Sequence, residues 1–346
     1  MPVPSDAPRI SLRDIAKKLG VSHATVSMAL RDHPRISTAL RTKIQEEAVA
    51  MGYRPDPLLT ALAHYRTGKT AKITHEEVGW MNGWPDPNKL RSYREFDLYW
   101  RGASEAAAKF GYHLEEYFCS NPAELERTQK ALLTRGVRGL LIPPQQVVPE
   151  WNEFPWSYFT LVRLGRSTNT PRALVVTSDQ VANTMIAAEK MRSLGYNRVG
   201  FVAVESLKRG MLFQAGYLRA QAEWPEESRL RPLCMENLPP EAWQTALSAW
   251  LKETRPDAIL TDVSEMRAML EKAGYRVPDD IGLAAESILD GNADAGIDQN
   301  PLEIGRVSFL LIMSQLNDHA RGVPPIFRQI LVEGMWVDGS TLPPRV

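Results

Sequence analysis

The stretch SLRDIAKKLGVSHATVSMALR, residues 11–31, has the spacing of two short helices joined by a tight turn. Its first half repeats apolar residues every three or four positions, between a candidate cap at Ser11 and a helix-stopping Gly20. Ser22 is placed to cap a second helix, whose inward stripe includes Val26. Two helices this close together predict a compact, all-helical head.

A third helix is expected after Ser37 and through residues 40–52, which completes a three-helix unit. Helical periodicity alone leaves two interpretations equally open. One is a generic three-helix domain, and the other is a helix-turn-helix domain that binds DNA.

The distribution of charge favours the second interpretation for the head. The whole chain of 346 residues has a formal net charge of zero, with 41 basic and 41 acidic residues. Residues 1–72 hold 12 Lys and Arg against 6 Asp and Glu, which leaves 29 against 35 for the rest. A basic head therefore precedes an acidic body, and a basic segment suits a polyanionic partner.

The order of residues in the head is more specific than its charge. The patterns D-I-A-x-x-L-G-V-S-x-x-T-V-S, I-S-x-x-x-R-x-K-I and G-Y-R-P occur in this order between Asp14 and Pro55. They resemble the N-terminal domain of LacI-family transcription regulators. The resemblance implies a second helix in the major groove of DNA and a first helix across the phosphate backbone.

The resemblance also assigns roles to individual residues of the second helix. His23 and Ala24 occupy its leading base-contacting positions, and hydroxyl groups beside them can bond phosphates. Met28 departs from the family, where an arginine that bonds guanine is common. Two interpretations of Met28 stay open, apolar contact with a thymine methyl and packing within the domain. The expected DNA-binding residues are Ser22, His23, Ala24, Thr25, Ser27, Met28, Arg31 and Leu62.

Leu62 lies in the segment RPDPLLTALA, which follows the third helix. The bland interpretation of this segment is a linker, because two helical turns are too short to be stable alone. The resemblance implies a hinge helix that folds on DNA and wedges Leu62 into the minor groove. Pro57 departs from the more usual residue there but is tolerated in a first turn.

From Glu77 onward the pattern changes to alternating strands and helices. Alternation of this kind predicts parallel sheets with helices on both faces. Two similar halves resemble the periplasmic-binding-protein-like core of the same family, with a ligand between the subdomains. The expected fold is thus an all-α helix-turn-helix head plus an α/β core of two subdomains. We expect a helix-turn-helix domain at 1–54, a hinge helix and linker at 55–72 and an effector-binding and dimerisation core at 73–346, with subdomains at about 73–166 and 301–323 and at about 167–300 and 324–346.

Ligands of such folds bind beyond the carboxyl ends of parallel strands. For each residue at these ends, a structural role and ligand contact are about equally expected. Arg163 and Ser287 stand where related regulators often have Asp, so the effector cannot be assigned. The aromatic segment 83–100 is either a lid or a surface loop. The expected effector-binding residues are Trp80, Asn82, Pro143, Arg163, Asp262, Ser287, Asp290 and Gln299.

Several classes of function find no support in the sequence. Phosphate-binding loops, zinc-protease motifs and serine-hydrolase motifs are absent, and Cys119 and Cys234 have neither a metal-ligand spacing nor a disulfide pattern. No signal peptide and no long apolar run is present. We therefore expect no catalytic residues, metal or cofactor, no membrane contact, and a cytoplasmic protein.

The sequence thus predicts a homodimeric repressor of transcription whose partners are double-stranded operator DNA and a small, sugar-like effector. The alternatives are a solute-binding module, or a sugar-modifying enzyme, fused to a helix-turn-helix. The sign of the effector's action and the operator sequence do not follow from the residues.

Overall fold

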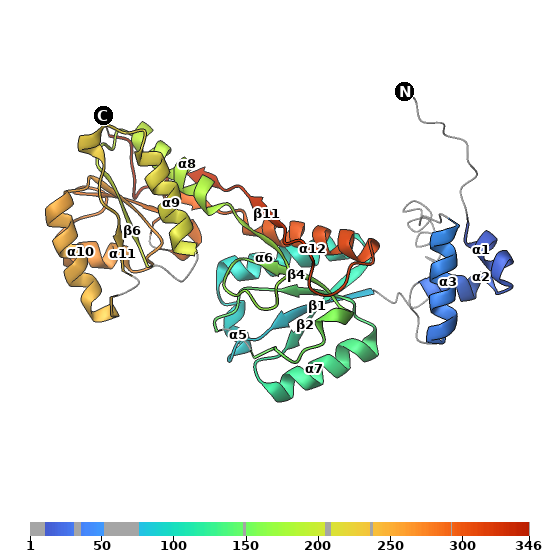
Figure 1. Cartoon of the computed structure of the whole chain (residues 1–346). Coiled ribbons are helices and arrows are strands. Elements are labelled where there is room, and N and C mark those ends of the chain that lie inside the picture. The colour runs from blue at the N-terminus through green and yellow to red at the C-terminus, as the bar shows by residue number, and fades with distance from the viewer. Residues whose placement is uncertain are drawn as a thin grey trace, which may run out of the picture. The chain divides into compact units, whose positions relative to one another are not determined.

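The structure, a computed structural model, describes residues 11–30, 36–51, 76–147, 150–204, 209–235, 238–291 and 293–345. The chain divides into two compact units, Met1–Thr74 and His75–Val346. Figure 1 shows both, and each is described by itself below.

The first unit contains α1 (Leu12–Leu19), α2 (His23–Leu30) and α3 (Thr38–Ala50). The Ser11 amide donates a hydrogen bond of 2.7 Å to the Asp14 carboxylate, which fixes the start of α1. Gly20 ends that helix in the left-handed region, at φ 66°. The three predicted helices are therefore present. Their small core consists of the buried residues Ile15, Ala16, Val26, Ala29, Ile36, Ile44 and Ala48.

The second unit contains two six-stranded sheets, here called sheet A and sheet B. Sheet A is parallel throughout, with the strand order β11-β5-β4-β3-β1-β2. One of its faces packs on α6 and α12, and the other packs on α7. Its elements are β1 (Glu76–Asn82), α5 (Pro87–Leu90), α6 (Arg94–Lys109), β2 (Tyr112–Phe118), α7 (Pro122–Arg135), β3 (Gly139–Ile142), β4 (Thr160–Leu164), β5 (Leu174–Ser178), α12 (Pro301–Asn317) and β11 (Gln329–Val332).

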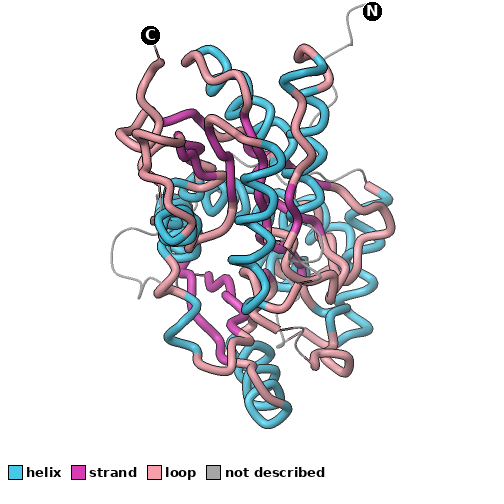
Figure 2. The backbone as a smooth tube through the Cα atoms, turned by 90° about the vertical axis from the view of Figure 1, so that its left-hand side faces the viewer, coloured by secondary structure: helices cyan, strands magenta, loops and turns pink. Residues whose placement is uncertain are grey.

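Sheet B has the order β12-β10-β9-β8-β6-β7, and only β12 runs antiparallel to its neighbour. Helices α8 and α9 pack on one face, and α10 and α11 on the other. In both sheets the strands, magenta in Figure 2, lie among cyan helices. The elements are α8 (Gln180–Ser193), β6 (Val199–Ala203), α9 (Arg209–Gln221), β7 (Leu233–Cys234), α10 (Pro240–Thr254), β8 (Ala258–Thr261), α11 (Met266–Lys272), β9 (Gly282–Ala285), β10 (Gly296–Asp298) and β12 (Met335–Val337).

The chain passes between the two sheets three times, and two of the passages differ from the prediction. β5 pairs with β4, so the first passage follows Ser178 rather than residue 167. β11 pairs with β5 and β12 with β10, so the last passage lies at Glu333 and Gly334 rather than near residue 324. The apolar run ILVEGMWV is thus divided between two sheets, because hydrogen-bonding register and not composition decides where each half pairs.

The aromatic segment 83–100 is neither a lid nor a surface loop. It forms α5 and the first turns of α6, and its Trp84 and Leu90 are buried in the core of sheet A. The Trp84 Nε1 donates a hydrogen bond of 2.8 Å to the Pro144 carbonyl. The segment is therefore anchored to the loop that follows β3.

None of the helices within the described ranges is both long enough and apolar enough to span a bilayer. Both cysteines are free thiols; Cys119 is buried, and Cys234 is half-buried. Burial raises the pKa of the Cys119 thiol well above its ordinary value, and the charge of Glu124 adds to this effect.

Candidate DNA-binding surface and effector site

The N-terminus of α2 presents its first residues to solvent. His23 and Ala24 are exposed, while Val26 and Ala29 turn inward and have no accessible surface. The Ser22 Oγ accepts a hydrogen bond of 3.0 Å from the Thr25 amide, so Ser22 is the predicted cap of this helix. An exposed, capped helix start is the part that a recognition helix inserts into a groove.

The remaining predicted DNA contacts of the head differ in their surroundings. Thr25 and Ser27 are half-buried, and the Thr25 Oγ1 lies 2.8 Å from Ser22 Oγ. Met28 is also half-buried and packs against the core of the head, as one of its two interpretations requires. Its contact with a thymine methyl stays a prediction. Arg31 and Leu62 lie outside the described residues.

Four of the predicted effector residues lie at the carboxyl edge of sheet A, but they do not share one environment. Trp80 is fully buried on the face that packs on α6, where its ring meets Trp100 edge-on at 5.5 Å. Pro143 follows β3, is buried, and its carbonyl accepts a hydrogen bond from Gln145. Trp80 is therefore a core residue, and Pro143 belongs to a buried turn.

Asn82 is fully buried and engaged on both sides of its amide group. Its Nδ2 donates to Glu116 Oε1 at 2.8 Å and to the Pro87 carbonyl at 3.0 Å, and its Oδ1 accepts from the Trp84 amide. These bonds hold the loop between β1 and α5. The Asn82 amide thus supports the edge of the sheet from within.

Gln145 plays a similar part and was not predicted. Its Nε2 donates to the carbonyls of Met81 and Pro143, and its Oε1 accepts from the Gly83 amide. The side chain therefore ties the ends of β1 and β3 together. No sequence pattern distinguishes this glutamine from others, because its partners are backbone atoms distant in the chain.

Arg163 is the fourth residue at this edge and is only 4% exposed. Its register partners are Ile142 on β3 and Val175 on β5, so its side chain leaves the sheet on the face opposite Val162 and Leu164. The Nη1 atom donates a hydrogen bond of 3.3 Å to the Pro171 carbonyl. A guanidinium is thus buried at the sheet edge where ligands of parallel sheets bind.

The other four predicted effector residues gather at the carboxyl edge of sheet B. Asp262 follows β8, and its Oδ1 accepts a hydrogen bond from the Val204 amide at 2.9 Å. Ser287 is buried and caps the short helix Ile288–Asp290, to which Asp290 belongs. Gln299 is buried, and its Nε2 donates to the Glu286 carbonyl at 2.7 Å. All four residues thus lie at the sheet edge where they were predicted, and their contact with a ligand stays a proposal.

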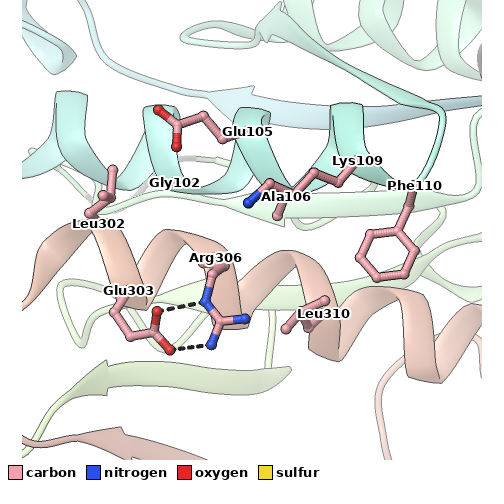
Figure 3. A pocket seen from close by; sticks show the side chains of 9 residues that line it. All are labelled: Gly102, Glu105, Ala106, Lys109, Phe110, Leu302, Glu303, Arg306 and Leu310. Carbon is pink, nitrogen blue, oxygen red and sulfur yellow. Dashed lines mark hydrogen bonds and ion pairs between the residues drawn. The ribbon is translucent and has the colours of Figure 1, made fainter.

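A pocket of about 100 Å³ lies between α6 and α12. Figure 3 shows Glu303 and Arg306 on α12, joined by two hydrogen bonds, across from Glu105 and Lys109 on α6. Gly102 lines this pocket, and a Cβ there would lie 1.9 Å from the Leu302 carbonyl oxygen, so the two helices are in close contact beside it. Within the described ranges, no group of three or more His, Cys, Asp or Glu side chains is placed to hold a metal ion.

Comparison with known proteins places the head in a family. Residues 11–56 match the family described as bacterial regulatory proteins, lacI family. The HTH-type transcriptional regulator AglR of Rhizobium meliloti is 28% identical over 221 residues, which cover 62% of this chain and 58% of AglR, less than two thirds of its length. The HTH-type transcriptional repressor CytR of Escherichia coli K12 is 22% identical over 323 residues, 88% of this chain and 89% of CytR.

Solved structures extend the similarity to the fold of the core. The transcriptional regulator CelR–cellobiose complex superposes with a TM-score of 0.56 at 18% identity, over 96% of this chain and 100% of that chain. The lac repressor dimer bound to operator and the anti-inducer ONPF gives 0.53 at 18% identity, over 97% and 99%. The head thus matches the lacI family of bacterial regulatory proteins in sequence, and the two-sheet core is similar in fold to these solved regulators.

Proposed function

We propose that the protein is a sequence-specific, DNA-binding repressor of transcription. The observation that carries this proposal is the start of α2, where Ser22 caps the helix and His23 and Ala24 stand exposed, within residues that match the lacI family. Two copies would each bring one head to a half-site, because a two-fold protein matches a two-fold operator. Its target is chromosomal DNA, so we place it in the cytoplasm.

We further propose that a small, sugar-like metabolite binds the core at the carboxyl edges of the two sheets. Similar solved structures are described as complexes with cellobiose and with ribose. A ligand that binds one arrangement of the core better than another changes operator affinity by the difference between the two binding energies, typically about 1–3 kcal/mol. On this proposal the protein acts by binding and not by catalysis.

The deciding measurement is operator selectivity of the full chain. Fluorescence anisotropy at physiological salt should show that a near-palindromic duplex from the protein's own promoter region binds at least about a thousandfold more tightly than a scrambled duplex of the same length. Equal affinity for the two would refute the repressor. Sugar binding without operator selectivity would instead support a solute-binding module, and turnover of the sugar would indicate an enzyme.

Two variants sharpen this test. His23→Ala should weaken the operator complex by about 1–3 kcal/mol and change binding to scrambled DNA little, because base contacts carry sequence information. The control is His113→Ala, another exposed histidine, on β2.

Leu62→Ala should weaken specific binding without changing thermal unfolding, and unchanged operator affinity would remove Leu62 from the wedge role.

A further inference from the structure

Arg163 is a buried cation in sheet A, and no carboxylate of the described residues balances its charge. Within the described ranges, its guanidinium has one hydrogen-bond acceptor, the Pro171 carbonyl at 3.3 Å, and its Nε has none. No carboxylate of the described residues forms an ion pair with it. Removing a guanidinium from water is costly unless charged and polar partners replace the water, and one long hydrogen bond does not replace it.

A second arginine adds to this positive charge. Arg166 is half-buried, its Nη2 donates to Gln329 Oε1 at 2.7 Å, and its Nε is also without a partner. Burial, reinforced by the charge of Arg166, lowers the pKa of Arg163 to about 10. The side chain therefore remains a cation at neutral pH.

The Asp179 carboxylate interacts electrostatically with Arg166 and favours its charged form. Its Oδ1 accepts a hydrogen bond of 3.1 Å from the Ala182 amide and so caps α8. Asp179 thus offsets Arg166 in part, while Arg163 keeps an unbalanced charge. A guanidinium in this state is suited to receive two oxygens of a planar or tetrahedral anion.

We propose that the effector of this protein is an anionic sugar derivative, whose carboxylate or phosphate group is bound by Arg163 at the carboxyl edge of sheet A. This inference rests on the proposed function, because it assigns the chemical class of the ligand expected there. The bound anion supplies the negative charge that balances Arg163 and the hydrogen-bond acceptor for its Nε, neither of which the described residues provide. Arg166, whose charge acts on Arg163, adds a second positive charge to this site.

The first test compares matched ligands on the full chain at constant ionic strength. The thermal-shift panel contains glucose, glucuronate and glucose 6-phosphate, then ribose, ribonate and ribose 5-phosphate, then cellobiose and cellobionate. At least one anionic member should raise the Tm by about 2 °C or more where its neutral partner does not, because a ligand specific to the folded state stabilises it. The carboxylate and phosphate arms distinguish the two sources of the anion. A panel in which no anion exceeds its neutral partner overturns the proposal.

The second test removes the charge. Arg163→Gln should weaken calorimetric binding of the selected anion by at least about tenfold and change binding of the neutral partner little. The matched control is Arg127→Gln, an exposed arginine on α7 that leaves the same net charge. Anion affinity that survives Arg163→Gln overturns the proposal.

Arg163→Met, without any ligand, separates a binding role from a structural one. A ligand-binding arginine without a counter-ion predicts a urea midpoint equal to or above that of the original chain, because a buried charge has been replaced by an apolar side chain. A lower midpoint would make Arg163 a structural residue. Operator selectivity is measured on the same preparations. A regulator that responds only to neutral sugars would refute this inference alone. A protein without operator preference would refute the proposed function.

Discussion

Asn183 and Gly334 are separated by 151 positions in the chain and joined by a hydrogen bond of 2.6 Å from the Gly334 amide to Asn183 Oδ1. The Nδ2 of the same side chain donates to Ser178 Oγ at 2.7 Å. Asn183, in the first turn of α8, therefore fastens the first and third passages between the sheets. The second passage joins this network where Asn300 Nδ2 donates to the Glu333 carbonyl at 2.8 Å.

Asn183→Ala should lower the free energy of unfolding of the core by about 3 kcal/mol. The variant loses both side-chain bonds and leaves the buried Gly334 amide without its acceptor, and an unsatisfied buried group costs about 1–3 kcal/mol. Urea denaturation followed by tryptophan fluorescence measures the change. Asn317→Ala, at the exposed end of α12, is the control and should shift the curve little. Equal curves for the two variants would show that the passages do not depend on Asn183.

Helices α6 and α12 approach each other through two glycines. A Cβ at Gly102 would lie 1.9 Å from the Leu302 carbonyl oxygen, and one at Gly305 would lie 2.1 Å from the Tyr99 carbonyl oxygen. In a free helix, glycine to alanine is stabilising by about 0.5–1 kcal/mol. Here Gly102→Ala should instead destabilise by about 3 kcal/mol, because backbone must move to admit the methyl group.

Chemical denaturation decides the sign of the Gly102→Ala effect. Ser314→Ala, on the exposed side of α12, is the control and should change the unfolding free energy by no more than about 0.5 kcal/mol. A stabilised Gly102→Ala variant would mean that the two helices are further apart than the structure has them.

Trp84 tests whether the segment 83–100 is part of the core. Trp84→Ala should cost about 3–5 kcal/mol, because a large buried ring is removed. Trp84→Phe keeps most of the ring but loses the bond to the Pro144 carbonyl, and should cost about 1–2 kcal/mol. Tyr93, which is 52% exposed beside Trp84, provides the control Tyr93→Ala. A mobile lid would show little effect for all three substitutions, measured as unfolding free energies.

The candidate site was predictable in position but not in orientation. Placing residues after buried strands located the carboxyl edges, since strand ends are visible as the end of an apolar run. The same rule does not say which face a side chain takes. Trp80 and Arg163 both lie near strand ends, yet one packs under α6 and the other lies on the opposite face. Only the pairing register separates them.

The fold was predictable where local signals are strong and missed where pairing is non-local. Ser11, Gly20 and Ser22 mark the helices of the head by capping chemistry that acts within a few residues. β5 and β11 are short strands that pair with each other although more than half of the core's residues lie between them in the sequence. Their membership of sheet A depends on contacts that no local pattern encodes.

Asp294 links the C-terminal segment to the strand β10 and gives a prediction for pH. Its Oδ1 accepts from the Thr341 amide at 2.8 Å, and its Oδ2 accepts from the amide and hydroxyl of Ser340 at 2.9 and 2.7 Å. Partial burial opposes ionisation, but these hydrogen bonds outweigh it and hold the pKa of the Asp294 carboxyl well below its ordinary value. A depressed pKa in the folded state contributes stability above the unfolded pKa, which is lost as pH falls through the folded pKa.

Asp294→Asn should therefore be less stable than the original chain at pH 7, and the gap should narrow when both are compared below about pH 4, where the unfolded carboxyl becomes protonated. Urea unfolding at pH 7, 5, 4 and 3 measures the gap, and subtraction of the two chains cancels the other carboxyl groups. Asp318→Asn, at the exposed end of α12, is the control for the loss of one negative charge. A gap for Asp294→Asn that stays constant with pH would mean that the ionised carboxylate does not hold Ser340 and Thr341.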